Sequence, residues 1–282
     1  MRFRRRFRSL HLSQTTATES VAMPEILLRR DGPVGTVIIS NADKFNAMTT
    51  QMWRDLPHRI AELDADPAIH AIVLAGAGDR AFVSGADISQ FGAERSDTAS
   101  QQSYGEAVDA SYLAPVRASK PVIAQIRGIC FGGGLGLAAA CDLRVCADDA
   151  RFRMPAGRLG LGYKPQGVQR FVALIGVQNT FDIFYSARVF DAADALRMGF
   201  VSRVVPAARL HDEVQTLATT IADNAPLSAR AAKLSINSAL DDQDQSILKA
   251  AEAAADACNA SEDYREGVRA FEQKRKPVFQ GR

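Results

Sequence analysis

The stretch GGGLGLAAACD, Gly132–Asp142, places three consecutive glycines and a fourth two residues later in front of an apolar run. Glycine loses more conformational freedom on folding than any other residue, so a backbone this bare is costly to order. The stretch therefore indicates a place where main-chain atoms must be approached closely. An apolar segment of strand length, PVIAQIRG (121–128), precedes the glycines, and a second one, DLRVCAD (142–148), follows them.

Strands and helices alternate on both sides of these glycines. EILLRRDGPVGTVIIS (25–40) predicts two strands joined by a turn, residues 49–64 a helix, and residues 69–76 and 81–84 two more strands. Helical residues follow to about residue 117, interrupted by a polar stretch at 92–103. This alternation predicts right-handed βαβ connections and a mostly parallel sheet, so the fold class is α/β.

From about Gly167 onward the pattern is almost wholly helical. FDAADALRMG (190–199) predicts a helix that Asp191 caps and Gly199 ends, and residues 207–223 place Leu210, Val214, Leu217 and Ile221 on one stripe. We therefore expect three parts in the chain. They are an extension outside the fold (1–22), an α/β core (23–205) and a helical C-terminal region (206–282).

Composition and charge exclude several classes of protein. Of the 282 residues, 47% are hydrophobic and 23% charged, and the uncharged run Gly128–Cys141 is shorter than the roughly 18 residues of a membrane span. Residues 1–22 hold five arginines against Glu19, a net +4, so a chain total of +2 leaves −2 on the rest. With the basic residues confined to one tail, the sequence predicts no nucleic-acid partner and no membrane partner.

The N-terminal extension admits two interpretations. It is rich in Arg, Ser and Thr and poor in acids, as mitochondrial presequences are, or else it precedes a true start at Met23. We expect a cytoplasmic protein, with the mitochondrial matrix as the alternative.

The cysteines and histidines do not predict a metal site. The four cysteines show neither CxxC nor CxxH spacing and three of them lie in apolar runs, which is typical of small buried hydrophobic residues in a reduced compartment. The four histidines are scattered along the chain.

Two kinds of ligand can be considered for the glycine stretch, a dinucleotide and an oxyanion. GLGLAA (134–139) matches the G-x-G-x-x-A pattern of dinucleotide sites, but Asp148 and Asp149 follow Gly134 by only 14 and 15 residues, where an acid about 20 residues on is needed. The better candidate is an oxyanion, because the first N–H groups of a helix have no intrahelical partners. A second N–H donor is available in AFVSGADI (81–88), and two such donors stabilise an enolate.

Several ordered motifs now point to one family. They are NADKFNAM (41–48), AFVSGADI (81–88), KPVIAQIRGICFGGGLGLAAACDLRVCA (120–147), SARVFDAADALRMGFVSRVV (186–205) and FEQKRKPVFQGR (271–282). Together they resemble the crotonase superfamily of enoyl-CoA hydratase/isomerases, from about residue 25 to the C-terminus. The resemblance implies a crotonase-like spiral of ββα units and a C-terminal helical region that assembles a homotrimer or hexamer.

The resemblance also implies the binding site. The carbonyl oxygen of an acyl-CoA thioester would be bound by the N–H groups of Ala86 and Gly133, and the thioester would be the substrate, with no separate cofactor. Further residues would line the coenzyme A: Lys44, Asn46, Ala47, Asp87, Ile88, Lys276 and Phe279. For Lys44 and Lys276 the alternative is plain solvation, and Asn46 and Asp87 could instead shape their loops.

Hydratases of this kind hold a water between two glutamates, which act as acid and base. The resemblance places Gly136 and Ala156 at these two positions, and neither side chain can transfer a proton. We therefore expect slow hydration of crotonyl-CoA. The remaining candidates for proton transfer lie in two places. Tyr163, Lys164 and Arg158 are on one loop, and Tyr104, Glu106, Asp109 and Tyr112 are in the segment after AFVSGADI (81–88). Three activities stay open: lyase or isomerase chemistry on an acyl-CoA, decarboxylation of a malonyl-type thioester, and acyl-CoA binding without catalysis.

Overall fold

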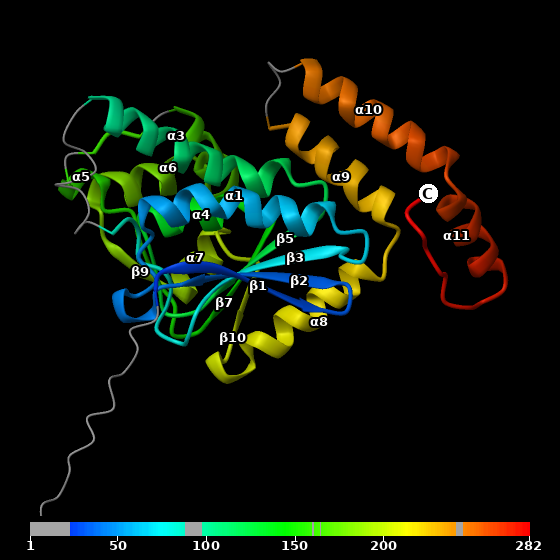
Figure 1. Ribbon diagram of the computed structural model, residues 1–282, viewed down its shortest axis with the longest axis horizontal. Helices are drawn as coiled ribbons and strands as arrows, with labels where there is room; N and C mark the ends of the chain where they lie inside the picture. Colours follow the sequence, from blue (N-terminus) through cyan, green and yellow to red (C-terminus); the bar gives the residue numbers. More distant parts are fainter. Residues whose placement is uncertain (1–22, 88–97, 160, 164, 241–244) are drawn as a thin grey trace, which may run out of the picture.

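The computed structural model describes residues 23–87, 98–159, 161–163, 165–240 and 245–282, so the N-terminal extension lies outside the described part (Figure 1). The strands are β1 (Glu25–Asp31), β2 (Val34–Ser40), β3 (Ala71–Gly76), β4 (Ala81–Val83), β5 (Val122–Ile126), β6 (Ile129–Phe131), β7 (Leu143–Ala147), β8 (Arg151–Arg153), β9 (Val189–Asp191) and β10 (Arg203–Val205). The helices are α1 (Thr50–Ala65), α3 (Thr98–Arg117), α4 (Gly133–Ala140), α5 (Ala156–Leu159), α6 (Pro165–Ser186), α7 (Ala192–Met198), α8 (Leu210–Ala222), α9 (Pro226–Ser238), α10 (Gln245–Ala260) and α11 (Glu262–Glu272).

The strands form two sheets, and the chain passes back and forth between them. The larger sheet has the order β1-β2-β3-β5-β7-β10 and the smaller one β4-β6-β8-β9. β1 and β2 form the predicted antiparallel pair, whereas β2, β3, β5, β7 and β10 run parallel. Strands β3, β5 and β7 of the larger sheet are each followed by one strand of the smaller sheet and then a helix. This repetition is the crotonase-like ββα spiral, and the predicted fold class is confirmed.

The central strands of the larger sheet are buried on both faces, and alternate residues of these strands pack on the two sides. In β3, Ile72 and Leu74 belong to the main hydrophobic core with α1 and α4, while Ala71 and Val73 pack with α8. In Figure 1, α8 lies below the sheet and α1 and α3 lie above it. A strand buried on both faces is apolar at every position, and this explains the uninterrupted apolar runs of the sequence.

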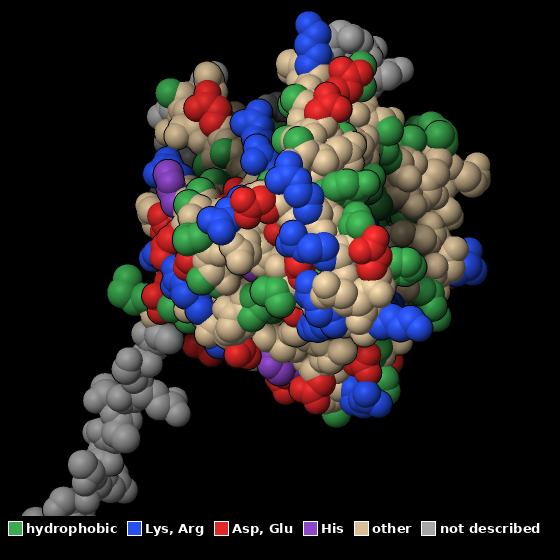
Figure 2. Space-filling model, turned by 90° about the vertical axis from the view of Figure 1, so that its right-hand side faces the viewer, with side chains coloured by type: hydrophobic (Ala, Val, Ile, Leu, Met, Phe, Trp, Pro, Cys, Tyr) green, Lys and Arg blue, Asp and Glu red, His purple; other side chains and the backbone are tan. Residues whose placement is uncertain are grey.

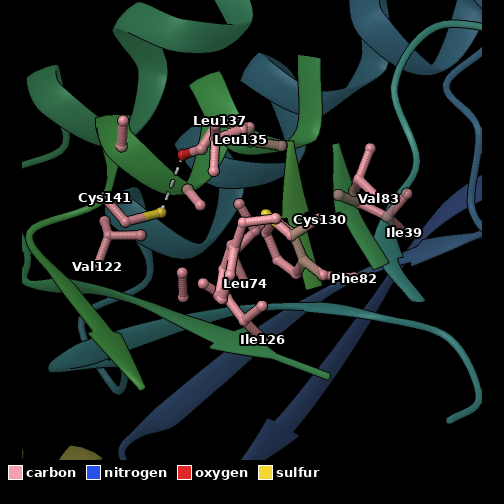
Figure 3. Close-up of a cluster of buried hydrophobic side chains, with 14 of the residues drawn as sticks. Ile39, Leu74, Phe82, Val83, Val122, Ile126, Cys130, Leu135, Leu137 and Cys141 are labelled. Carbon is pink, nitrogen blue, oxygen red and sulfur yellow. Dashed lines mark hydrogen bonds between the residues drawn. The ribbon is translucent and has the colours of Figure 1, made fainter. Parts of the chain in front are cut away.

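The main core surrounds the helix that the glycine stretch begins. Figure 3 shows side chains of α4 packed on β4, β5 and β6, with the Cys141 Sγ donating to the Leu137 carbonyl at 3.4 Å. Cys130, Cys141 and Cys146 are buried and free, and burial raises the pKa of the Cys141 and Cys146 thiols to about 12. These three cysteines are the small buried hydrophobic residues that the sequence predicts.

Two helices begin and end where their sequences indicate. Thr49 caps α1 by accepting a hydrogen bond from the Met52 N–H, and the Asp191 carboxylate accepts one from the Asp194 N–H at the start of α7. Gly199 ends α7 with a left-handed conformation, φ 84°, which glycine adopts without the penalty that a Cβ brings.

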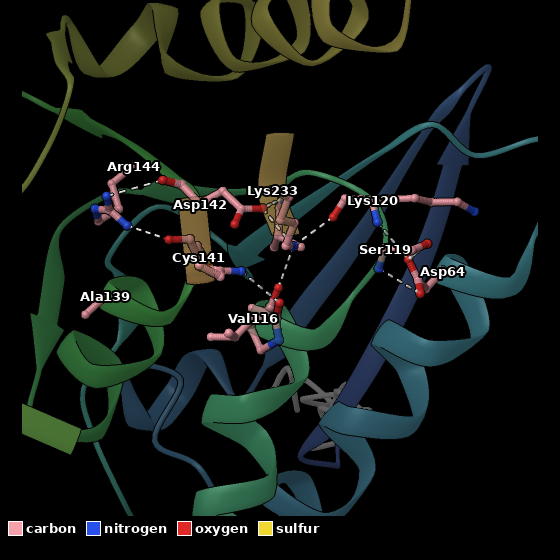
Figure 4. Close-up of polar contacts among 12 residues, drawn as sticks. Asp64, Val116, Ser119, Lys120, Ala139, Cys141, Asp142, Arg144 and Lys233 are labelled. Carbon is pink, nitrogen blue, oxygen red and sulfur yellow. Dashed lines mark hydrogen bonds and ion pairs between the residues drawn. The ribbon is translucent and has the colours of Figure 1, made fainter. Parts of the chain in front are cut away.

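A buried lysine holds α9 on the core. The Lys233 ammonium donates to the carbonyl oxygens of Pro115 (2.7 Å) and Lys120 (2.9 Å) and lies 2.8 Å from the Asp142 carboxylate (Figure 4). These partners belong to α3, the α3–β5 connection and the start of β7. The Asp142 carboxylate also accepts from the Val122 N–H of β5. One cation therefore joins the C-terminal helices to three segments of the core.

The last helices pack on one another and on the returning C-terminal segment. α10 packs against α9, and α11 follows from the end of α10. The Glu266 carboxylate of α11 binds the Arg275 guanidinium and the Val278 N–H, while Asp263 accepts from the N–H groups of Gln280 and Gly281. Figure 2 views the end of the molecule at the right of Figure 1, where basic and acidic side chains lie intermixed.

Three details of the expected secondary structure are wrong. Residues 98–103 of the predicted polar interruption are helical and begin α3, and the region after Gly167 contains the short strands β9 and β10. The buried stripe of α8 is Leu210, Val214, Ala218 and Ala222, with Leu217 and Ile221 at its edges. Small alanines let α8 lie close to the sheet, and three-residue strands are too short to show a period; both features depend on tertiary packing.

Candidate functional site

The glycine stretch links β6 to α4 and exposes the first N–H groups of the helix. Gly132 takes up φ 51°, a left-handed conformation, and its N–H donates to the Arg153 carbonyl at 2.9 Å. α4 then begins at Gly133, whose N–H lies in the first turn and has no carbonyl of its own helix to bind. The positive end of the helix dipole lies at this N–H and strengthens its attraction for an anionic oxygen.

Only two residues of α4 are not buried, and both lie on one side of the helix. Six of its eight residues are buried, and the two that are not are Gly133 and Gly136, one turn apart. Residues three apart lie on the same side of a helix. The side chain that packs over Gly136 therefore lies on the same side of α4 as Gly133.

The second predicted donor lies on the loop after β4. The Met48 N–H donates to the Gly85 carbonyl and the Asp87 N–H to the Met48 carbonyl, each at 2.8 Å. Because successive peptide groups of an extended chain point to opposite sides, the Ala86 N–H points away from Met48. Ala86 is half-buried and lies between two buried neighbours, Gly85 and Asp87.

The two donor loops touch each other. A Cβ built on Gly85 would lie 3.8 Å from the Gly133 nitrogen and 3.5 Å from the Phe131 carbonyl oxygen. A methyl group on Gly134 would overlap the Val83 carbonyl. The glycines thus permit a close approach of two backbone segments, and the structure brings Ala86 and Gly133 onto neighbouring loops. Such an arrangement can hold one carbonyl oxygen between two N–H groups.

The segment Lys44–Ala47 lies next to the loop that carries Ala86. Asn46 is buried with φ 55°; its amide donates to the carbonyls of Ala77 (2.9 Å) and Ala81 (2.8 Å), and its Oδ1 accepts from the Asn41 N–H. The two amide bonds join Asn46 to the connection after β3 and to the first residue of β4, and the third bond lies within the segment itself. The Asn46 side chain thus holds loops together, and the adjacent Ala47 is buried.

Lys44 and Asp87 are brought together beside the donor loop. The Lys44 ammonium lies 2.8 Å from the Asp87 carboxylate, with side chains 53% and 6% exposed. The cation stands at the rim of the site, where a phosphate of a long ligand could reach it, and its buried partner anchors it there. Ile88, the next predicted contact, lies outside the described residues.

No carboxylate of the segment around the glycines reaches the site. Asp142 binds Lys233, Asp148 accepts from the Ala207 N–H, and Asp149 accepts from the Gly128 N–H. Ala156, at the start of α5, is buried, and Gly136 has no side chain. Gly136 and Ala156, which the resemblance aligns with the two glutamates, carry no group that transfers a proton.

Aromatic side chains fill the space beside Gly133 and Gly136. Tyr112 of α3 packs edge-on against Trp53 of α1, with ring centroids 5.9 Å apart, and Trp53 lies next to Gly133. The Trp53 Nε1 is buried and has no hydrogen-bond partner within the described residues. Burial raises the pKa of the Tyr112 phenol well above its usual range, and the nearby Tyr163, Tyr104 and Asp109 add to this effect.

The other candidates for proton transfer are placed differently. Tyr163 packs edge-on against Phe184, and burial raises the pKa of its phenol to about 12. Glu106 is exposed and accepts from the Gln102 amide, and Arg158 is exposed on α5. Lys164 lies outside the described residues.

Lys276 and Phe279 contact a different part of the chain. Lys276 forms an ion pair with Asp223 at the end of α8. Phe279 lines a surface cavity of about 440 Å³ with residues from the end of α8 and the start of α9. Within one chain these two residues are not joined to the donor loops by any contact of the described residues.

Sequence reasoning missed Trp53. It is the only tryptophan of the chain and adjoins Met52, which the helical spacing places in the core, but nothing local indicates that its ring lies against the glycine stretch. Tyr112 stood among several candidates, with no signal to single it out.

Comparisons with known proteins show the family of the chain. The family described as enoyl-CoA hydratase/isomerase matches residues 29–282. The chain is 32% identical over 254 residues to the short-chain-enoyl-CoA hydratase of Clostridium acetobutylicum, covering 89% of this chain and 95% of that protein. It is 36% identical over 260 residues to a protein of Mycobacterium bovis named "probable enoyl-CoA hydratase", covering 90% and 97%.

A solved structure shows the same fold. The crystal structure titled "enoyl-CoA hydratase/ carnithine racemase" from Magnetospirillum magneticum superposes with a TM-score of 0.86 at 32% identity, covering 93% of this chain and 97% of that one. Within the described residues, no helix is long and apolar enough to cross a membrane. The sequence match and the ββα spiral agree, and the chain belongs to the enoyl-CoA hydratase/isomerase family, the crotonases.

Proposed function

We propose that this protein binds an acyl-CoA thioester and stabilises its enolate between the N–H groups of Ala86 and Gly133. The observation that carries the proposal is the contact between the two donor loops, with Gly133 at the start of α4 and accessible. Relatives named as enoyl-CoA hydratases support the thioester as ligand. Two preorganised backbone donors of this kind contribute several kcal/mol to an oxyanion's stability, ~3–4 kcal/mol for one donor in a studied protease.

The reaction is of the lyase or isomerase type, and hydration of an enoyl-CoA is not its main activity. Hydration needs one group to deprotonate water and another to protonate the α-carbon. Gly136 and Ala156 supply neither, and the acids of the surrounding segment are bound elsewhere. An enolate that forms without a base, as in the loss of carbon dioxide from a malonyl-type thioester, suits such a site.

Lys44 would hold the phosphate end of the coenzyme A while the thioester lies at the donors. The Lys44–Asp87 ion pair at the rim of the site supports this assignment. Lys276 and Phe279 would take part only through another subunit, because their contacts within one chain are with α8 and α9.

The test is a panel of coenzyme A thioesters with enoyl, malonyl-type and aryl acyl groups, each incubated with the purified protein and analysed by mass spectrometry. We expect binding of several thioesters and turnover of at least one that forms an enolate. Binding with no turnover across the panel would favour acyl-CoA binding without catalysis, and absence of binding would refute the proposal.

A further inference from the structure

The open face of α4 is covered by Tyr112. A Cβ built on Gly136 would lie 2.9 Å from both Cζ and Oη of Tyr112 and 3.2 Å from its Cε1, closer than real side chains pack. The phenol has little room to withdraw, because its ring rests edge-on against Trp53, which is fully buried. The side chain of Tyr112 and any side chain at residue 136 therefore compete for one volume.

The Tyr112 hydroxyl lies on the same face as the Gly133 donor. It donates a hydrogen bond to the Gly133 carbonyl oxygen at 3.4 Å and lies 3.5 Å from the position of a Cβ on Gly133. Gly133 and Gly136 are the two residues of α4 that are not buried. The hydroxyl therefore lies beside the residue whose N–H is the proposed donor to the thioester carbonyl.

We propose that Tyr112 is the hydrogen-bond and proton donor of the site, placed in the volume that a side chain at residue 136 would fill. This inference rests on the proposed function, since it requires a thioester enolate at the donors. It singles out one residue among the candidates for proton transfer and explains why residue 136 is glycine.

The environment of the phenol decides which proton transfers it performs. Burial raises the pKa of the phenol, so at physiological pH the phenol is protonated and cannot act as a base. Such a site selects substrates whose enolate forms without a base. In a malonyl-type thioester the bond between the α-carbon and the carboxylate breaks, carbon dioxide leaves, and the electron pair forms the enolate.

The α-carbon then takes the proton of the Tyr112 hydroxyl, and water returns a proton to the phenolate. The net change is the consumption of one proton and the release of carbon dioxide. The enolate carbon of a thioester is a far stronger base than a phenolate, so even a phenol with a raised pKa can protonate it.

The first experiment uses acetoacetyl-CoA, a thioester that ionises to an enolate without turnover. The pH at which the bound ligand ionises is followed by the ultraviolet absorbance of the enolate, in the native protein and in Tyr112→Phe. We expect the substitution to raise this pH by about one unit, a tenfold change in the ionisation constant. Affinity for butyryl-CoA, which does not ionise in this range, should change less than about twofold.

Tyr185→Phe is the matched control, since Tyr185 is 79% exposed on α6. Equal ionisation in the native protein and Tyr112→Phe would overturn the assignment. If the native protein binds neither thioester, the proposed function fails and the proton-donor role fails with it.

The second experiment tests the shared volume without any ligand. In the native background Gly136→Ala should lower the melting temperature, because the new methyl group collides with the phenol. In a Tyr112→Ala background the same substitution should raise it, because alanine favours the helix over glycine. A higher melting temperature of Gly136→Ala in the native background would contradict the packing argument, whatever the binding data show.

Discussion

Lys233 of α9 and Asp142 at the start of β7 form an ion pair of 2.8 Å, with side chains 7% and 22% exposed. The lysine also satisfies two carbonyl oxygens, so its removal leaves several buried acceptors without a donor. We expect Lys233→Met to lower the free energy of unfolding by about 3 kcal/mol, as for other broken buried pairs. Denaturant unfolding measures this loss, and Lys249→Met on the exposed side of α10 is the control. A loss below about 1 kcal/mol would show that the pair does not hold α9.

Gly133→Pro should abolish recognition of the thioester carbonyl. Proline is tolerated in the first turn of a helix but has no N–H to donate. Gly133→Ala keeps the N–H and is the matched control, although its methyl group would approach the Trp53 ring at 3.0 Å. By calorimetry we expect acyl-CoA affinity to fall at least tenfold in the proline variant and to persist in the alanine variant. A folded Gly133→Pro protein with native affinity would disprove the role of this donor.

Crotonyl-CoA hydration should be slow in the native protein. Loss of one acid–base group typically costs about 10²–10⁴ in rate, and ordinary enzymes turn over about 1–10³ times per second. The assay follows disappearance of the enoyl chromophore. Native turnover in the ordinary range would show that another residue supplies the proton.

Glutamates introduced at residues 136 and 156 should raise the hydration rate only when space is made for the side chain at residue 136. Because a side chain at 136 collides with Tyr112, we expect Gly136→Glu/Ala156→Glu to remain slow, and addition of Tyr112→Ala to raise its hydration rate. The double variant compared with the triple variant isolates this effect, and an equally active double variant would argue against the collision.

The C-terminal segment should detach from α11 in acid. Hydrogen bonds from Arg275 and Val278 lower the pKa of the Glu266 carboxyl to about 2. A lowered pKa in the folded state means that the ionised form stabilises the fold. This contribution is complete above the ordinary carboxyl pKa of about 4.3 and is lost as the pH falls toward 2. Hydrogen exchange of residues 275–282 should accelerate over this range, and in Glu266→Gln it should already be fast at neutral pH.

The exposed apolar side chains on one face of α11 should take part in the contact between subunits. Tyr264, Val268 and Phe271 are 56%, 44% and 86% exposed, and they recur at helical spacing on one face. We expect light scattering to give a trimer or hexamer for the native protein. Val268→Asp/Phe271→Asp should lower the mass, while Glu272→Lys on the same helix should not. A native monomer at micromolar concentration would refute this assembly.

The sequence predicts the parts of this molecule that depend on local chemistry. Apolar runs, the Asp191 cap and the Gly199 stop appear in the structure where their residue types require them. Glycines in front of a helix indicate exposed N–H groups, and the structure places them at the start of α4, while the role of Ala86 and Gly133 as donors stays a prediction. The three cysteines of the apolar runs are buried as their neighbours suggest.

What the sequence does not reveal is which distant side chains share a volume. Tyr112 and Gly136 lie on separate helices, and their contact follows from how α3 and α1 pack over α4. Lys233 looks in the sequence like a surface lysine of α9, yet it is buried by partners from three segments. Such contacts arise from tertiary packing, which no local pattern encodes.

Both proposed oxyanion donors, at Ala86 and Gly133, are main-chain atoms. Apart from proline, no substitution at either position removes the N–H itself. Recognition of the carbonyl is thus insulated from point mutation, whereas the groups that move protons are side chains and change freely. A lineage with this architecture can exchange one reaction for another, or lose its reaction altogether, and still bind the same class of ligand.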